Sequence, residues 1–382
     1  MKNRTDGDRS RPFRLGIDCR LVLDKPTGIG SYILGTIRGL SAVAGGLRLQ
    51  LVTGESVPAT LTAAAGQFPD VGFWECPLPP FGLRQKLQAH RYLNRLDLDV
   101  LLYPHHDVPF SLKMPVVTVV HHVPSLFVGT GPNLAKRMLL LSSLAWSIRR
   151  SQRVVAVSGY TAQLLRRFFG VPGRKIAVIY PPPSPVMTAE KGVPLPGGLR
   201  PGRYFLSVAE WRPHKNLARL VRAFARARSG LGGDWKLAIA GAPYGDGRWL
   251  PEEVERAGVS EDVLLLGKVG PEGLRTLYEN AAALVFVSLL ENFGYPVVEA
   301  FHFGTPVICS NAGSLPEVAG NAAVLVNPRD EIQIADAMLK LAADPGLRQE
   351  LVQAGKQQLP RFSPAVSAEQ TLKVCKEAAR NL

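Results

Sequence analysis

Short apolar runs alternate with amphipathic segments along the whole chain, and this alternation predicts strands separated by helices. In the first half, the runs of strand type are Phe13–Asp18, Leu47–Val52, Val71–Trp74, Val100–Tyr103, Val116–Val120, Val154–Val157 and Ile176–Ile179. In the second half, they are Tyr204–Val208, Lys236–Ala240, Val263–Leu266, Ala283–Ser288, Pro306–Cys309 and Ala323–Val326. Because strands that alternate with helices form parallel sheets, the pattern predicts an α/β protein with doubly wound domains.

Helical periodicity is clearest where a helix follows a polar loop. Asn216, a good N-cap, precedes an apolar stripe formed by Leu217, Leu220, Val221 and Phe224. A similar stripe follows the turn Gly28-Ile29-Gly30, and its members are Ile33, Leu34, Ile37 and Leu40. Further helices are predicted at Pro271–Asn280, from Asp330 to Ala343, and around Pro364–Arg380.

Length and composition indicate a globular chain with two cores. The chain has 382 residues, of which 46% are hydrophobic and 20% charged, so two domains are expected. Prolines and glycines crowd residues 183–202, which predicts an extended, semi-rigid linker between a domain at 1–182 and a domain at 203–363.

Localisation signals are few. The longest apolar stretch, Met138–Trp146, is too short to span a bilayer, and the polar N-terminus lacks the apolar core of a signal peptide. The four cysteines are widely spaced and form no C-x-x-C pair, which is typical of free thiols in a reducing compartment. We therefore expect a cytoplasmic protein.

The net charge of +14 is concentrated in the first half. Residues 1–182 contain 23 Lys and Arg against 10 Asp and Glu, whereas residues 183–382 contain 22 against 21. A basic field of this kind indicates an anionic partner, or simply a basic solvent-facing surface. Two basic segments with an apolar side, Leu83–Leu96 and Leu134–Arg150, could lie on anionic lipid, although a helix with a solvated basic face and a packed apolar side is the commoner explanation. No basic motif interleaved with aromatic residues supports nucleic acid as the partner.

Two glutamates flank a loop where a predicted strand gives way to a helix. Glu291 follows the strand, and Glu299 lies in the first turn of a helix opened by Pro296. Both are expected at the carboxyl edge of the sheet, where open α/β sheets bind ligands, and the helix dipole favours an ionised Glu299. Ionised carboxylates there can accept hydrogen bonds from a sugar or ribose diol. The alternative is two unrelated carboxylates on a surface helix.

Three neighbouring loops suit a phosphate. Asn292, Phe293 and Gly294 would let backbone N–H groups approach a ligand closely, and Gly294 has no Cβ to prevent it. Ser314 and Leu315 open a second short helix with further N–H donors. Lys215, with Arg212 nearby, precedes the helix that begins after Asn216, so a cation and free N–H groups could meet a diphosphate there.

The segment Glu291–Ala300 resembles the E-x7-E motif of the retaining, GT-B-fold glycosyltransferases of family 4. Ser314–Val326 resembles the segment that follows this motif in the bacterial mannosyl- and rhamnosyltransferase branch. The resemblance covers most of the chain and is strongest from about Tyr204 to Asp330. It implies two Rossmann-like domains that face a cleft, with a C-terminal helix at about 364–382 that packs back on the first domain.

The resemblance also implies roles for single residues. Glu299 would bind the nucleotide ribose, Glu291 the donor-sugar hydroxyls, and Lys215 the diphosphate. Arg212 would replace an arginine that many members carry five or six residues before the lysine, where this chain has Ala209 and Glu210. The base would rest near Lys268 and Val269. In the first domain, Gly28 and Gly30 would approach the diphosphate and His121 the sugar. The family's usual His-Asp pair is His121-His122 here, which leaves open how His121 is held and which tautomer it adopts.

Taken together, the sequence predicts a retaining glycosyltransferase that transfers a hexose in surface polysaccharide synthesis. The favoured hexose is mannose, and the favoured donor is GDP-mannose. The expected partners are a nucleotide sugar, a glycan or lipid-linked glycan acceptor and an anionic membrane surface at the inner face of the plasma membrane, but no nucleic acid. We expect no metal or other cofactor, because adjacent histidines such as His105-His106 point to opposite sides of an extended strand. The alternatives are a sugar-nucleotide 2-epimerase of the same architecture and a basic protein that binds nucleic acid or an anionic surface.

Overall fold

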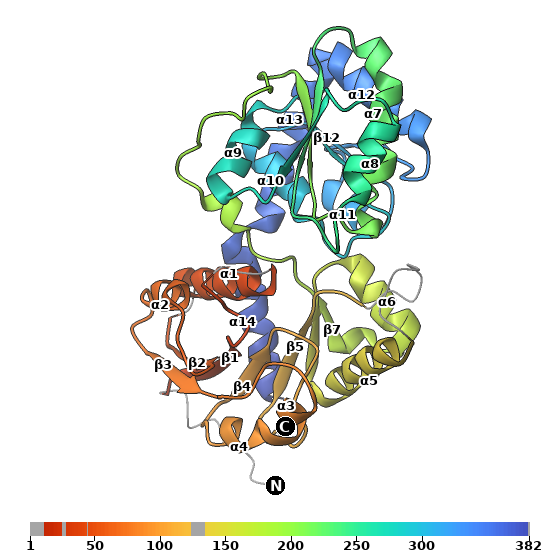
Figure 1. Ribbon diagram of the computed structural model, residues 1–382. Helices are drawn as coiled ribbons and strands as arrows, with labels where there is room; N and C mark the ends of the chain where they lie inside the picture. Colours follow the sequence, from red (N-terminus) through yellow and green to blue (C-terminus); the bar gives the residue numbers. More distant parts are fainter. Residues whose placement is uncertain (1–10, 25–27, 44, 124–133, 381–382) are drawn as a thin grey trace. The chain divides into compact units, whose positions relative to one another are not determined.

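The computed structural model describes residues 11–24, 28–43, 45–123 and 134–380. The chain divides into two compact units, with boundaries after Pro182 and after Phe362. The first unit contains the N-terminal part of the chain together with residues 363–380, and the second unit begins at Pro183. Each unit is built on one parallel sheet (Figure 1).

The first unit has a seven-stranded sheet in the order β3-β2-β1-β4-β5-β6-β7. Its strands are β1 (Phe13–Asp18), β2 (Leu47–Thr53), β3 (Val71–Glu75), β4 (Val100–Tyr103), β5 (Val116–Val120), β6 (Arg153–Ala156) and β7 (Ile176–Val178). Its helices are α1 (Gly28–Val43), α2 (Ala59–Ala65), α3 (Leu83–Gln88), α4 (His90–Leu93), α5 (Leu134–Arg150), α6 (Gly159–Phe169) and α14 (Pro364–Arg380).

The second unit has a six-stranded sheet in the order β10-β9-β8-β11-β12-β13. Its strands are β8 (Tyr204–Val208), β9 (Lys236–Ala240), β10 (Val263–Gly267), β11 (Ala283–Phe286), β12 (Val307–Ser310) and β13 (Val324–Val326). Its helices are α7 (Leu217–Leu231), α8 (Trp249–Arg256), α9 (Pro271–Asn280), α10 (Tyr295–Phe303), α11 (Leu315–Ala319), α12 (Glu331–Ala343) and α13 (Pro345–Gln358). Short 3₁₀ helices among the described residues are η1 (Gly173–Lys175) in the first unit, and η2 (Pro185–Thr188), η3 (Pro213–Lys215) and η4 (Leu359–Phe362) in the second.

Both sheets are covered on two faces, as strands without a polar side require. In β4, Val100 and Leu102 join the core beneath α1 and α14, whereas Leu101 and Tyr103 join a second core on the opposite face. The stripe predicted for α7 is buried throughout, at Leu217, Leu220, Val221 and Phe224. The α/β class with two Rossmann-like sheets is therefore confirmed.

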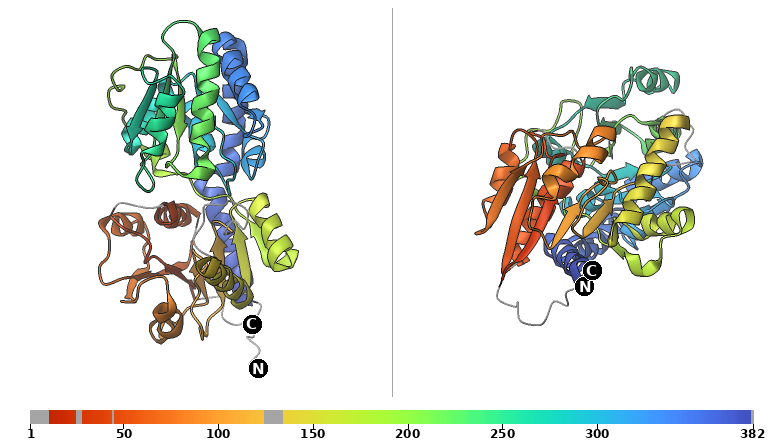
Figure 2. Two further views of the ribbon diagram at one scale, coloured as in Figure 1. Left: turned by 45° about the vertical axis from the view of Figure 1, so that its right-hand side comes forward. Right: turned by 90° about the horizontal axis from the view of Figure 1, so that it is seen from below.

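The C-terminal helix α14 packs against α1 within the first unit. Gly39 of α1 makes this approach close, because a Cβ added there would lie 2.6 Å from the carbonyl oxygen of Pro364. Ser367 donates a hydrogen bond to the carbonyl oxygen of Tyr180, 2.9 Å away, and Cys375 is fully buried in the same core. Both views in Figure 2 show this blue helix among the elements of the first unit.

The Pro- and Gly-rich segment at 183–202 differs from the extended tether that its composition predicts. It belongs to the second unit and forms η2, which packs against α9. Thr276 of α9 exchanges hydrogen bonds with the backbone of Val193, and Arg275 donates to the carbonyl oxygens of Ala189 and Glu190. Proline limits the freedom of the chain, but these side chains of α9 decide where the segment lies.

The basic segment Leu83–Leu96 also differs from the prediction of one helix with a buried apolar side. It divides into α3 and α4, and α3 buries Gln85 and Lys86 while Leu83 and Leu87 are 69% and 50% exposed. Lys86 is buried because it pairs with Asp107, whose carboxylate is 3.0 Å away. In the described residues, no helix is long and apolar enough to cross a membrane.

Candidate active site

Two loops of the second unit meet between β8 and β11, where the strand order reverses. Lys215 ends η3, which follows β8, and Glu291 lies between β11 and α10. The Lys215 Nζ donates to Glu291 Oε1 at 2.6 Å, and the two side chains are only 19% and 12% exposed. The switch point of an open α/β sheet is the usual position of its ligand. The structure therefore brings together two of the residues singled out from the sequence.

The backbone around Lys215 is held by hydrogen bonds that pass between loops. Asn216 adopts a left-handed conformation with φ of 62°, and its side-chain amide donates to the carbonyl oxygens of Val287 and Pro328. Leu289 donates its N–H to the carbonyl oxygen of His214. Asn216 does precede α7, but the prediction that its side chain caps that helix is wrong, because the amide instead ties η3 to the end of β11.

The backbone of Glu291 is braced by the loop between β12 and α11. Gly313 has φ of 64°, and a Cβ there would lie 2.6 Å from the Glu291 carbonyl oxygen. Ser314 donates its N–H to the same carbonyl oxygen, and its hydroxyl donates to the carbonyl oxygen of Phe293 at 2.9 Å. Leu315 is fully buried and fills the space above Gly294.

This bracing corrects the prediction that Ser314 and Leu315 present N–H groups to a phosphate. The N–H groups of Ser314 and Leu315 donate to the carbonyl oxygens of Glu291 and Ala312. The loop between β12 and α11 therefore positions the Glu291 loop. In the loop before α10, Asn292 is half-buried, the Phe293 ring is buried beside Tyr295 and Phe362, and Gly294 is the left-handed residue that precedes the helix.

Glu299 is buried in a network of hydroxyl groups. Its carboxylate accepts a hydrogen bond from Ser184 at 2.6 Å on one oxygen and from Tyr278 at 2.7 Å on the other, and the residue is 5% exposed. Burial raises the pKa of Glu299, against the opposite effect of the two hydroxyls. Since α10 begins at Tyr295, Glu299 lies in the second turn. The expectation that Glu299 lies in the first turn is therefore wrong, while ribose binding stays a prediction.

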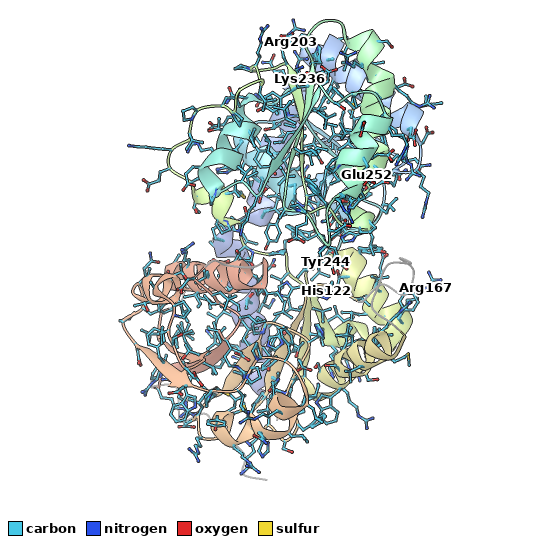
Figure 3. The ribbon with its side chains drawn as sticks, viewed as in Figure 1. His122, Arg167, Arg203, Lys236, Tyr244 and Glu252 are labelled. Carbon is cyan, nitrogen blue, oxygen red and sulfur yellow. The ribbon has the colours of Figure 1, made fainter. Side chains whose placement is uncertain are left out.

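Arg212 lies in the loop after β8 but is directed to its own neighbours. Its guanidinium donates to Glu210 at 2.7 Å and lies over the Tyr244 ring at 3.9 Å from the ring centroid (Figure 3 labels Tyr244). The Arg212 side chain is 39% exposed, twice as much as that of Lys215. Arg212 and Lys215 therefore share a loop, whereas only Lys215 contacts Glu291.

The proposed base-binding residues lie after β10, two strands from β8. Lys268 is exposed and Val269 is half-buried, immediately after Gly267. The adjacent loop after β9 is close to them, because Gly241 donates its N–H to the carbonyl oxygen of Gly267. A Cβ on Gly241 would overlap the Ala209 carbonyl oxygen. The carboxyl edge from β10 to β11 is therefore one continuous surface of loops.

In the first unit, His121 follows β5 and its tautomer can be assigned. Its Nε2 lies 3.0 Å from the carbonyl oxygen of Pro104, and since a carbonyl only accepts, Nε2 must carry the proton. Burial, and then the charge of His122, lowers the pKa of His121 to about 3, so the ring is neutral near pH 7. Gly28 is the exposed first residue of α1, and Gly30 is buried in its first turn. Thr27 lies outside the described residues.

The arrangement can bind an anion beside a group that accepts hydrogen bonds. Lys215 supplies a cation with several donor directions, and Glu291 supplies acceptors for hydroxyl groups. Among the described residues, no group of three His, Cys, Asp or Glu side chains could hold a metal ion.

Sequence reasoning missed two supporting residues and gave a third a different role. Ser184 and Tyr278 approach Glu299 from 115 and 21 residues away, and no local pattern marks either of them. Gly313 belongs to the loop predicted to bind phosphate, and only its type gave a weak signal for the turn that braces Glu291, because glycine readily adopts a left-handed conformation.

Comparisons with known proteins give a consistent result. A family model described as "Glycosyl transferases group 1" matches residues 200–358, and one described as "Glycosyltransferase Family 4" matches residues 26–183. The O-antigen chain mannosyltransferase B of Escherichia coli is 27% identical over 369 residues, which cover 92% of this chain and 96% of the relative. The O-antigen chain mannosyltransferase RfbU of Salmonella typhimurium is 28% identical over 227 residues, 59% of this chain and 60% of the relative. Among solved structures, sucrose-phosphate synthase from Thermosynechococcus elongatus matches with a TM-score of 0.73 at 18% identity, covering 96% of this chain and 98% of that chain.

Proposed function

Because this chain belongs to the family 4 glycosyltransferases of GT-B fold, we propose that it transfers a hexosyl residue, mannose in the first instance, from a nucleoside-diphosphate sugar. The acceptor is a saccharide or lipid-linked saccharide of a surface polysaccharide, and the anomeric configuration is retained. Mannose is supported by the names of the two O-antigen relatives. GDP is the favoured nucleotide, on the resemblance of the segment Ser314–Val326 alone.

The observation that carries the proposal is the pair Lys215–Glu291 at the switch point of the second sheet. In the transfer, the bond from the anomeric carbon to the diphosphate oxygen breaks, and a bond to an acceptor hydroxyl oxygen forms as that hydroxyl loses its proton. Negative charge grows on the departing diphosphate, and Lys215 would stabilise it. Glu291 would orient the donor through its sugar hydroxyls. Electrostatic stabilisation of this kind is usually the largest single contribution to catalysis.

A donor screen tests the proposal. The full chain is mixed with GDP-, UDP-, dTDP- and ADP-sugars, and the shift in thermal unfolding identifies the donor, because a ligand that binds the native state stabilises it by mass action. We expect GDP-mannose to give the largest shift and Lys215→Met to reduce it. Lys340→Met, at an exposed position of α12, is the matched control and should respond like the wild type.

Product analysis then decides the reaction. Transfer to an acceptor with an unchanged anomeric configuration in the NMR spectrum supports the proposal. Inversion at the anomeric carbon would refute the retaining mechanism. Conversion of the sugar nucleotide to its 2-epimer with no acceptor product would refute transfer and favour the epimerase alternative.

We further propose that the first unit works at an anionic membrane surface. On α3, Leu83 and Leu87 are exposed together with the cation Arg84, and α5 exposes Met138 and Leu139 at 55% and 68%. Apolar side chains among cations suit the boundary of an anionic bilayer. Cosedimentation should increase with the fraction of anionic lipid in vesicles and fall for Leu83→Asp. Equal binding of both forms, or none to any vesicle, would refute it.

A further inference from the structure

Three rings form a row at the carboxyl edge of the first sheet. Phe81 precedes α3, His106 follows β4, and His122 follows β5. The ring centroids are 6.4 Å apart between Phe81 and His106, and 5.6 Å apart between His106 and His122. Phe81 is 44% exposed, and His122, which is labelled in Figure 3, is also exposed. We call Phe81, His106 and His122 the ring row.

The ring row is supported from below and from the side. The buried ring of His105 lies 4.8 Å from Phe81 and 4.4 Å from Tyr103, so Phe81 covers a rigid aromatic layer. Gly82, with φ of 103°, donates its N–H to Asp107 at 3.0 Å, which fixes the turn that carries Phe81. An exposed phenylalanine held in this way is available to a ligand without first being ordered.

Two cations beneath the ring row are neutralised by buried carboxylates. Arg20 pairs with Asp18 at 2.7 Å, and both side chains are 1% exposed. Lys86 pairs with Asp107, which also accepts a hydrogen bond from Ser143 at 2.6 Å. Because a carboxylate neutralises each of these two cations, neither pair offers the positive charge that a phosphate requires.

The histidines add polar groups without charge. Burial, and then the neighbouring His122 and His105, lowers the pKa of His106 to about 4. Although the His122 side chain is exposed, the protein around it removes part of its hydration, which also lowers the pKa of His122. Each neutral imidazole has one nitrogen that donates and one that accepts a hydrogen bond. The ring row therefore combines flat apolar surface with uncharged hydrogen-bonding groups.

We propose that the ring row is a subsite for a neutral pyranose of the acceptor, with Phe81 stacking on the C–H face of the sugar and His106 and His122 binding its hydroxyls. A pyranose presents one apolar face and a rim of hydroxyls, which matches a ring beside uncharged donors and acceptors. A diphosphate at the ring row would gain little from Arg20 or Lys86, because each of them is already paired with a carboxylate. The inference rests on the proposed glycosyl transfer and defines the acceptor as a saccharide end that extends beyond any lipid diphosphate.

The test compares acceptors and variants of the full chain. Loss of an aromatic contact costs about 0.5–1.5 kcal/mol, so Phe81→Ala should raise the KM for a neutral mannose oligosaccharide roughly 2- to 13-fold. The donor KM should not change, and Phe81→Trp should retain the wild-type acceptor KM. Phe168→Ala, which removes a similarly exposed ring on α6, is the matched control and should leave the acceptor KM unchanged.

Two results would overturn the subsite. One is an unchanged KM for the oligosaccharide in Phe81→Ala that is still folded by circular dichroism. The other is a KM that rises only for acceptors in which a single sugar is joined directly to a lipid diphosphate. If the wild type transfers no sugar from any donor, the proposed function fails, and saturation-transfer NMR with mannobiose then tests the subsite alone. Mannobiose signals that Phe81→Ala does not weaken would overturn it.

Discussion

Replacing Lys215 by methionine tests the central assignment, because it removes the charge and keeps most of the aliphatic stem. The Nζ lies 2.6 Å from Glu291 in a site where neither side chain is more than 19% exposed, so water replaces the lost charge poorly. By analogy with the removal of one oxyanion donor, we expect kcat to fall by about 10²–10³, or roughly 2.7–4 kcal/mol. The donor KM should rise less, since charge on the diphosphate grows mainly in the transition state.

The same change should also lower the free energy of unfolding. It leaves the Glu291 carboxylate without its cation, and an unsatisfied buried group costs about 1–3 kcal/mol. Lys215→Met/Glu291→Gln should recover part of that stability but none of the activity, because both groups act on the donor. This pattern separates a catalytic loss from a loss of folded protein.

The assay follows release of nucleoside diphosphate and is normalised to the folded fraction from urea unfolding. Arg212→Met is the comparison in the same loop. Its exposed pair with Glu210 is worth only about 0–1 kcal/mol, so its stability should hardly change. A Lys215→Met enzyme whose kcat stays within threefold of the wild type would refute the assignment. If Arg212→Met alone loses turnover, Arg212 binds the diphosphate.

Two further substitutions test the groups around the site. Burial raises the pKa of Glu299, so its contribution to stability is fully present below the unfolded-state pKa and is lost as pH rises through the folded-state pKa. Glu299→Gln should therefore become more stable relative to the wild type from pH 5 to pH 8. Urea unfolding that shows the reverse trend would contradict this. Gly313→Ala should lower turnover at least tenfold, because its Cβ would collide with the Glu291 carbonyl oxygen. Gly258→Ala is the control, because Gly258 has φ of 69° and its Cβ would have no atom within 4 Å. This variant has only the left-handed strain of about 1–2 kcal/mol and should keep full turnover.

Much of the architecture could be predicted from local patterns. Five of the predicted strands, among them Val100–Tyr103 and Tyr204–Val208, match the structure to the residue, and so does the helix Pro271–Asn280. Elsewhere the ends differ by one or two residues, as expected where hydrogen bonding fades. Apolar periodicity is a local property, and the signal is strongest in β4, β5, β11 and β12, which are buried at every residue.

Only part of the chemistry of the site could be predicted from the sequence. Lys215 and Glu291 were each predicted from a loop position, but their contact depends on β8 and β11 being neighbours in the sheet. The surroundings of Glu299 could not be predicted, because its partners Ser184 and Tyr278 come from other elements. Burial by those elements, and not the nearby helix end, determines the pKa of its carboxyl group.

The sequence by itself determined the strands, the helices and the two loops that carry charge, because these depend on neighbours within a few residues. Only the tertiary structure decided the strand order, the burial of Glu299 and Lys86, and the bracing of Glu291 by Gly313. These features depend on residues far apart in the chain that pack together once both faces of each sheet are covered. The pairing of a cation with a carboxylate at the switch point follows from that packing, and it carries the proposed reaction.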